Sequence, residues 1–426
     1  MTTSSLGRGL APVRRELPNG AVLIAKQSRT TPAVTIHASF EAGSVFDPPE
    51  YPGVAHLVSR MLDRGTATRS AAALADELDG RGVSLAIAVN RHVISVVCTC
   101  LAEDFEAILE LVGDVAMHAA FPEQELASRR AEAITMIRQD EDNPAAMAME
   151  GLLRLLYPGH PYGARPRGSV ESVERMPRAA LDAFHRSRFA PGTLALVMVG
   201  DVEPARALDA AARVFGDWNR PQPPPAALPP VDDPRERQRL VLPMMNKAQA
   251  DVAYGFVTVL RSDPQYYACN LMNNILGQYS LGGRLGDSIR ERQGMAYYCF
   301  SSLDANVVRG PLTIRAGVNP ANVDRAIASI DAEVARMAAE GPTVKELEES
   351  RQFLIGSMPR MLETNAGIAN FLQTVEFFDL GLDYDVRLPG LLHAVTRDAV
   401  HEAARRLLDV SRAAVVVAGP YDPDAR

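Results

Sequence analysis

The sequence has few cysteines and no long apolar run. Four cysteines among 426 residues are too few for a disulfide-stabilised scaffold, and their spacing matches no zinc finger. No stretch approaches the roughly 18 consecutive apolar residues that cross a bilayer. The beginning of the chain lacks the apolar segment of a secretory signal, so we expect a cytoplasmic protein. The cysteines are Cys98, Cys100, Cys269 and Cys299.

An excess of positive charge is also missing. The 44 lysines and arginines are outnumbered by 52 aspartates and glutamates, which gives a net charge of −8 and a pI of about 5.6. This balance argues against wholesale binding to nucleic acid or to an anionic membrane. A hydrophobic fraction of 47% with 23% charged residues is ordinary for a globular protein. A chain of 426 residues is too long for one core and fits two domains.

Proline marks the boundary between the two predicted domains. The segment from Trp218 to Pro234 contains too many prolines for a helix or a central strand, so it is predicted to be an extended linker. We therefore predict an N-terminal domain at residues 1–219, a linker at 220–234 and a C-terminal domain at 235–426.

The two predicted domains repeat one another. An apolar strand and a turn at 194–204 have a counterpart at 414–423, with Gly200 and Gly419 in equivalent places. An amphipathic helix precedes each strand, and each half opens with strand-like sequence, at 34–40 and 251–256. The simplest account is a duplicated α+β domain, each copy a largely antiparallel sheet packed with helices.

A histidine lies in a helical pattern at 53–66. The apolar residues around it recur at helical spacing, which puts His56 and Arg60 one turn apart on another face. Arg60 is a fixed cation that cannot bind a metal, and Ser59 cannot replace a carboxylate as a base at neutral pH. Because a catalytic zinc needs three protein ligands, His56 alone predicts no metal site.

A second candidate site lies in the C-terminal half. Gly294 is predicted to end a helix that carries Arg290, and a strand is predicted from Met295, so the junction can direct Arg290 and Tyr297 into one cleft. A guanidinium and a phenol suit a peptide carbonyl that becomes an oxyanion. The residue types alone favour the alternative of a surface arginine and a half-buried strand tyrosine.

These motifs, in this order, resemble the M16 metallopeptidases of the pitrilysin and mitochondrial-processing-peptidase type. The family carries two zinc ligands and a base in a His-x-x-Glu-His helix. Here His56 is retained, Ser59 stands at the glutamate position and Arg60 at the second histidine position. The position of the third ligand falls on Met136, with Glu132 and Asp140 each one turn away.

The same resemblance assigns Arg290 and Tyr297 to the pair that binds the substrate backbone. It implies a zinc-free subunit, inactive alone, that binds peptides in a closed chamber formed with a homologous partner. The partner would carry the intact His-x-x-Glu-His motif and the zinc. Two alternatives remain: a structural or peptide-holding protein, like the M16-like core subunits of respiratory complexes, and a zinc peptidase with displaced ligands.

Overall fold

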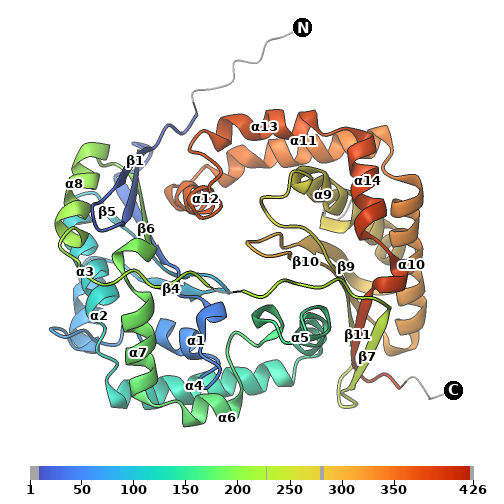
Figure 1. Ribbon diagram of the computed structural model, residues 1–426, viewed down its shortest axis with the longest axis horizontal. Helices are drawn as coiled ribbons and strands as arrows, with labels where there is room; N and C mark the ends of the chain where they lie inside the picture. The colour runs from blue at the N-terminus through green and yellow to red at the C-terminus, as the bar shows by residue number, and fades with distance from the viewer. Residues whose placement is uncertain (1–8, 227, 279–282, 423–426) are drawn as a thin grey trace, which may run out of the picture. The chain divides into compact units, whose positions relative to one another are not determined.

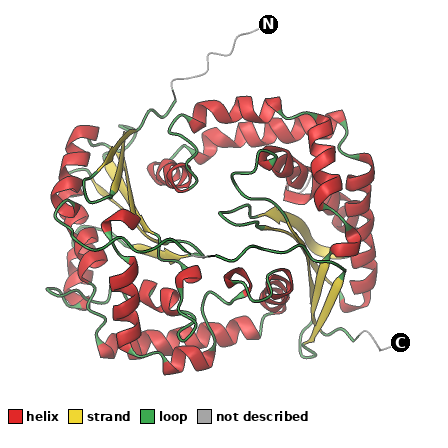
Figure 2. Cartoon of the chain, in the orientation of Figure 1, coloured by secondary structure: helices red, strands yellow, loops and turns green. Residues whose placement is uncertain are grey.

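The computed structural model describes residues 9–226, 228–278 and 283–422. It divides into two compact units, and each unit is assembled from three separate segments of the chain. The first unit takes its residues from Met1–Ile137, Arg165–Ala227 and Met358–Arg387, and the second from Arg138–Ala164, Leu228–Ser357 and Leu388–Arg426. Each unit contains one sheet with helices against it (Figures 1 and 2).

The first unit contains a six-stranded sheet with the order β1-β2-β6-β3-β5-β4. β2 and β6 are parallel, and the other neighbours are antiparallel. The strands are β1 (Val13–Glu16), β2 (Val22–Gln27), β3 (Ala33–Phe40), β4 (Ala86–Val89), β5 (Ile94–Leu101) and β6 (Leu194–Gly200). The helices of this unit are α1 (Val54–Ser59), α2 (Ala71–Asp79), α3 (Phe105–His118), α4 (Glu123–Glu141), α6 (Val170–Arg175), α7 (Arg178–Arg188), α8 (Pro204–Phe215) and α12 (Asn365–Phe377).

The second unit contains a five-stranded sheet with the order β7-β11-β8-β10-β9. Its strands are β7 (Gln238–Pro243), β8 (Ala250–Val257), β9 (Ala296–Leu303), β10 (Pro311–Val318) and β11 (Ala414–Gly419). Its helices are α5 (Pro144–Leu156), α9 (Tyr266–Asn273), α10 (Val323–Glu340), α11 (Val344–Met361), α13 (Tyr384–Ala394) and α14 (Arg397–Leu407), with π-helical segments at Asn274–Gln278 and Gly286–Arg292. The last turns of α4 and α11 and the first residues of α13 fall across the boundary between the units.

The two sheets share one topology. In the first sheet the order β2-β6-β3-β5-β4 has one parallel pair followed by antiparallel neighbours, and β7-β11-β8-β10-β9 repeats this pattern in the second. The α+β class is therefore confirmed, with one parallel pair in each otherwise antiparallel sheet. The matching order supports the predicted duplication, and it makes β4 and β9 equivalent edge strands among the strands described.

Each sheet has a central strand that is buried on both faces. In β3 the residues Val34, Ile36, Ala38 and Phe40 are 0% exposed, and seven of its eight residues are classed as buried. All eight residues of β8 are buried as well. A strand enclosed on both faces needs helices on both sides of the sheet.

In each unit, one of these covering helices comes from the other half of the sequence. α12 lies at 365–377 but packs on β3 and β6 of the first sheet, whereas α5 lies at 144–156 but packs on β8 and β11 of the second (Figure 1). Close packing of α5 depends on Gly151, since a Cβ there would meet Val416 Cγ1 at 3.0 Å. In the sequence, the proline-rich linker lies between the strands of the first sheet and those of the second. α5 and α12 are exceptions, because each packs on the sheet whose strands lie on the other side of the linker.

Gln373 attaches α12 to the first sheet. Its side-chain amide donates to the carbonyl oxygens of His37 at 2.7 Å and Ala195 at 2.9 Å, and its oxygen accepts from Ser39 Oγ at 2.6 Å. Gln373 is 8% exposed. We expect Gln373→Leu to lower the free energy of unfolding by about 2 kcal/mol, because it leaves buried polar groups unsatisfied.

Chemical denaturation measures the free energy of unfolding and so tests this prediction. Thr374→Val, which removes an exposed intrahelical hydrogen bond one residue further on, is the matched control. An equal loss of stability in both variants would contradict the role assigned to Gln373.

Among the residues that the structure describes, no helix is both long and apolar enough to cross a membrane.

Candidate functional site

The predicted motif helix exists as α1 and is short and fully enclosed. All six of its residues are buried. Gly53 precedes it with φ of 94°, and a Cβ there would lie 2.5 Å from the carbonyl oxygen of Arg167, so only glycine fits this approach. The carboxylate of Asp47 accepts from the backbone N–H groups of Gly53 at 2.6 Å and Ala55 at 2.9 Å. Asp47 therefore caps the helix N-terminus, where the backbone donors have no partner within the helix.

The three motif residues lie at the end of α1. His56 is 9% exposed and Ser59 is 3% exposed. The Ser59 hydroxyl donates to the carbonyl oxygen of His56 at 2.7 Å, so it is turned back onto its own helix. Arg60 is the C-terminal capping residue, and its N–H donates to His56 O at 3.2 Å. The predicted spacing of one turn between His56 and Arg60 is therefore observed.

The guanidinium of Arg60 reaches a carboxylate on α4. Arg60 Nη2 lies 3.4 Å from Glu132 Oε2, and Arg129 Nη1 lies 2.6 Å from the same oxygen. Glu132 is one of the two carboxylates one turn from Met136, and the structure brings it, rather than Met136, to the motif helix. Two cations thus neutralise the carboxylate of Glu132.

Met136 lies in apolar surroundings. It is half-buried against the small cluster formed by Ala133, Ile137 and Val173. A thioether in such a cluster fills space and offers a hard metal ion no charge.

The residues at the motif do not fit a zinc ion. Zinc needs neutral imidazole, thiolate or carboxylate ligands, and the motif contributes His56 beside a serine, a guanidinium and a thioether. Across the described ranges, no group of three or more histidine, cysteine, aspartate or glutamate side chains is arranged to hold a metal. The chemistry available at this helix is therefore ion pairing between α1 and α4.

Arg290 and Tyr297 belong to the second unit. Arg290 lies in the π-helical segment Gly286–Arg292, and Gly294 follows with φ of 60°. A π-helical turn is rare and is often found at functional sites. The Arg290 side chain is 43% exposed, and its Nε lies 3.5 Å from a carboxylate oxygen of Glu291, a long contact between exposed groups. Its charge is therefore available to a ligand.

Tyr297 stands out in β9. It is 70% exposed, which is unusual for a large aromatic side chain in a strand. β9 is the edge of its sheet among the strands described, so its outer side faces no strand partner. A tyrosine and an arginine with exposed polar ends, seven residues apart across a helix–strand junction, offer hydrogen-bond donors to a peptide carbonyl.

Sequence reasoning missed two contacts at these elements. The Asp47 cap could have been suspected from an aspartate shortly before a glycine and an apolar helical run. Arg129 had no signal of its own, because an arginine on an amphipathic helix usually faces solvent.

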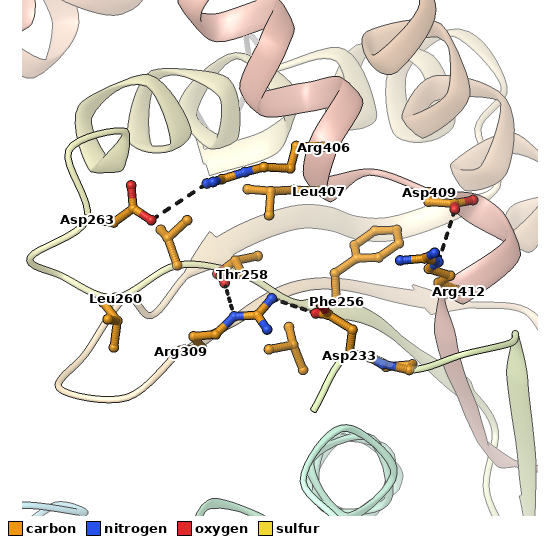
Figure 3. Close-up of a pocket in the computed structure, with 13 residues that line it drawn as sticks. Asp233, Phe256, Thr258, Leu260, Asp263, Arg309, Arg406, Leu407, Asp409 and Arg412 are labelled. Carbon is orange, nitrogen blue, oxygen red and sulfur yellow. Dashed lines mark hydrogen bonds and ion pairs between the residues drawn. The ribbon is translucent and has the colours of Figure 1, made fainter. Parts of the chain in front are cut away.

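A cavity of about 410 Å³ lies elsewhere in the second unit (Figure 3). Three arginines line it, and each is paired with an aspartate: Arg309 with Asp233, Arg406 with Asp263 and Arg412 with Asp409. Equal numbers of the two charges leave it without a strong field for an anion or a cation.

Sequence matches link this chain to one family. Residues 22–166 match the family described as insulinase (peptidase family M16), and residues 175–354 match the peptidase M16 inactive domain. A Mycobacterium tuberculosis protein named as an uncharacterized zinc protease is 26% identical over 422 residues, which cover 97% of this chain and 94% of that protein. Core protein I of the ubiquinol-cytochrome-c reductase complex of Euglena gracilis is 25% identical over 295 residues, covering 68% of this chain and 56% of that one.

Solved structures agree with the sequence matches. The crystal structure of a peptidase M16 inactive domain from Pseudomonas fluorescens has a TM-score of 0.91 at 26% identity and covers 98% of this chain and 100% of that one. A protease from Helicobacter pylori has a TM-score of 0.91 at 15% identity, covering 97% and 100%, and shows the common fold. The two matched segments are consecutive and together span most of the sequence, so the protein belongs to peptidase family M16.

Proposed function

We propose that this chain is the zinc-free, substrate-binding subunit of a heterodimeric M16 metallopeptidase. The observation that carries the proposal is the ion-pair group at the motif helix, where Glu132 lies between Arg60 and Arg129. The guanidinium of Arg60 supplies the positive charge that a metal ion would otherwise supply to the carboxylate of Glu132. The site is therefore stable without zinc and has no group to activate water.

In this proposal the second unit retains a binding role. Arg290 and Tyr297 bind and orient the backbone of a peptide through their exposed donor groups. A homologous partner with an intact His-x-x-Glu-His helix supplies the zinc and the base. The substrates are peptides or unfolded segments that can enter a closed chamber between the two subunits.

The isolated chain is expected to contain no stoichiometric zinc and to leave a fluorescent casein substrate uncleaved. Metal analysis of the purified protein and a proteolysis assay measure both quantities. The control is the same assay after mixing with a homologous M16 chain from the same organism that has the complete motif, where proteolysis should appear. One zinc per chain, with activity lost on chelation, would instead establish a peptidase with displaced ligands.

A structural role is the second candidate, favoured by the similarity to core protein I of Euglena gracilis. It differs from the first in one measurable respect. A structural subunit would associate with a partner without affecting peptide cleavage, whereas a substrate-binding subunit would be required for it.

A further inference from the structure

Tyr297 occupies a β-bulge at the start of β9. Val318 of β10 pairs with Ala296 and Gly317 pairs with Tyr298, so Tyr297 is the extra residue with no partner across the ladder. Bulges bend an edge strand and redirect a side chain, and they are frequent beside functional sites. The ladder itself does not hold the orientation of Tyr297, because the bulged residue lies outside the regular pairing.

The residue that follows the bulge is anchored two strands away. The Tyr298 hydroxyl donates to the carboxylate of Asp251 on β8, and it crosses the intervening strand β10 to reach it. Asp251 is 5% exposed, and its other oxygen accepts from Gln249 Nε2 at 3.3 Å. Burial and the neighbouring carboxylate raise the pKa of Tyr298, so its phenol stays protonated and remains the donor at neutral pH.

Gly317 lets the Tyr298 ring cross β10. In the sheet register Gly317 is paired with Asp251 on one side and with Tyr298 on the other. A Cβ at this position would lie 2.6 Å from Tyr298 Cε1 and 2.4 Å from Gln249 Nε2. Any larger residue would therefore push the ring away from Asp251.

The other end of the bulged segment is fixed to the π-helical segment. The N–H of Gly294 donates to the carbonyl oxygen of Arg290, and the N–H of Met295 donates to that of Ile289, both at 3.1 Å. The backbone between these bonds and Tyr298 is short. Fixing both of its ends restricts the backbone at Tyr297 relative to the segment that carries Arg290.

We infer that Asp251, Gly317 and Tyr298 form a strut that positions Tyr297 for peptide binding beside Arg290. The three are positioning residues, since they act through Tyr297 and do not themselves contact the peptide. The inference rests on the proposed function for the role of Tyr297, but the effect of the strut on that side chain can be measured without a peptide.

The test labels the protein with 3-fluorotyrosine and records the ¹⁹F resonance of Tyr297, which Tyr297→Phe identifies among the 11 tyrosines. We expect Tyr298→Phe and Gly317→Ala to shift or broaden this resonance. Asp251→Asn retains an oxygen that accepts from Tyr298, so it should preserve the wild-type resonance. In the same variants, binding of a fluorescein-labelled unstructured casein peptide should weaken by about 10-fold where the strut is broken, as for the loss of one hydrogen bond from Tyr297 to the peptide.

The matched control is Tyr421→Phe. It removes another tyrosine–aspartate hydrogen bond of the second unit, from Tyr421 Oη to Asp324 at 2.9 Å. A Tyr297 resonance that does not respond to Tyr298→Phe, or that responds equally to Tyr421→Phe, would overturn the inference. A resonance that follows the strut in a protein that binds no peptide would uphold the positioning role and refute the proposed function.

Discussion

Replacing Arg290 by alanine and Tyr297 by phenylalanine in this chain is expected to lower kcat/KM of the mixed subunits by about 100-fold. The zinc content and the assembly of the pair should not change. Loss of a single preorganised donor to a developing oxyanion typically costs this much or more. The measurement is peptide cleavage after mixing the variant chain with its zinc-bearing partner.

The structure offers a close control for the arginine. Arg292 lies two residues further along the same π-helical segment, its side chain is 58% exposed, and it pairs with Asp287 at 3.0 Å. Arg292→Ala removes the same charge from the same segment, so it should change kcat/KM by less than about threefold, as for an exposed ion pair. Full activity in the Arg290/Tyr297 double variant, or an equal loss in Arg292→Ala, would remove the basis for a substrate-binding subunit.

The difference between the altered motif at His56 and the retained pair Arg290 and Tyr297 could be predicted from the sequence. The residue types of Ser59 and Arg60 are enough to predict the altered zinc motif, since neither residue can bind zinc or act as a base at neutral pH. The α+β class and the duplication were also predictable, because strand-like and helical segments recur in the same order in both halves.

The partners of these residues were not predictable. A helical pattern shows that α5 and α12 bury one face but not which sheet that face meets, so the crossing of each helix into the other unit had no sequence signal. The position of Glu132 against Arg60 depends on how α4 lies beside α1. The bulge at Tyr297 depends on a one-residue shift of register, which leaves the local composition of β9 unchanged.

Acidification is expected to unfold the first unit between pH 6.5 and 4. Three of its histidines, His37, His92 and His185, are at most 7% exposed, and burial lowers the pKa of each to about 4. In the unfolded chain the pKa is 6.5, so the unfolded state binds protons first as the pH falls. Their contribution to stability is thus complete above pH 6.5 and is lost as the pH approaches 4.

The expected size of this effect is large. A shift from 6.5 to about 4 corresponds to roughly 3 kcal/mol for each histidine, or about 10 kcal/mol for three. Asp47 acts in the opposite direction, because burial raises its pKa to about 7 and its protonation stabilises the folded state by up to about 4 kcal/mol as the pH falls. The net loss of about 6 kcal/mol is comparable to the whole stability of a typical domain.

The chain contains a built-in reporter for this transition. Its single tryptophan, Trp218, is 8% exposed in the first unit and packs against Phe40 and Phe215. Tryptophan fluorescence in urea at a series of pH values therefore measures the free energy of unfolding of this unit. His185 accounts for one third of the histidine effect, and its Nε2–H donates to the carbonyl oxygen of Ala116 at 2.8 Å.

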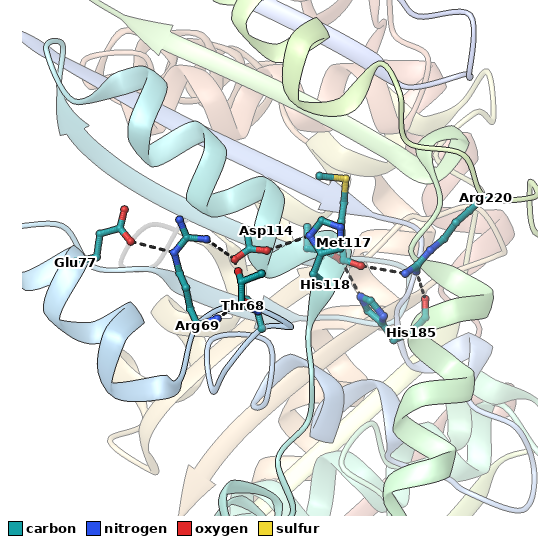
Figure 4. A network of polar contacts seen from close by, with 10 residues as sticks. Thr68, Arg69, Glu77, Asp114, Met117, His118, His185 and Arg220 are labelled. Carbon is teal, nitrogen blue, oxygen red and sulfur yellow. Dashed lines mark hydrogen bonds and ion pairs between the residues drawn. The ribbon is translucent and has the colours of Figure 1, made fainter.

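Substitution of His185 separates titration from packing. The side chain lies against α3 in the network of Figure 4, where the backbone oxygen of His185 also accepts from Arg220. Gln can donate to Ala116 but cannot titrate, so His185→Gln should reduce the loss of stability between pH 6.5 and 4 by about 3 kcal/mol. His118→Gln is the control, at a histidine whose side chain is 55% exposed and contacts Asp114 in the same network, and it should leave a larger loss of stability than His185→Gln does. A first unit that is as stable at pH 4 as at pH 7 would contradict the lowered pKa of the three buried imidazoles, because burial without compensating partners disfavours their charged form.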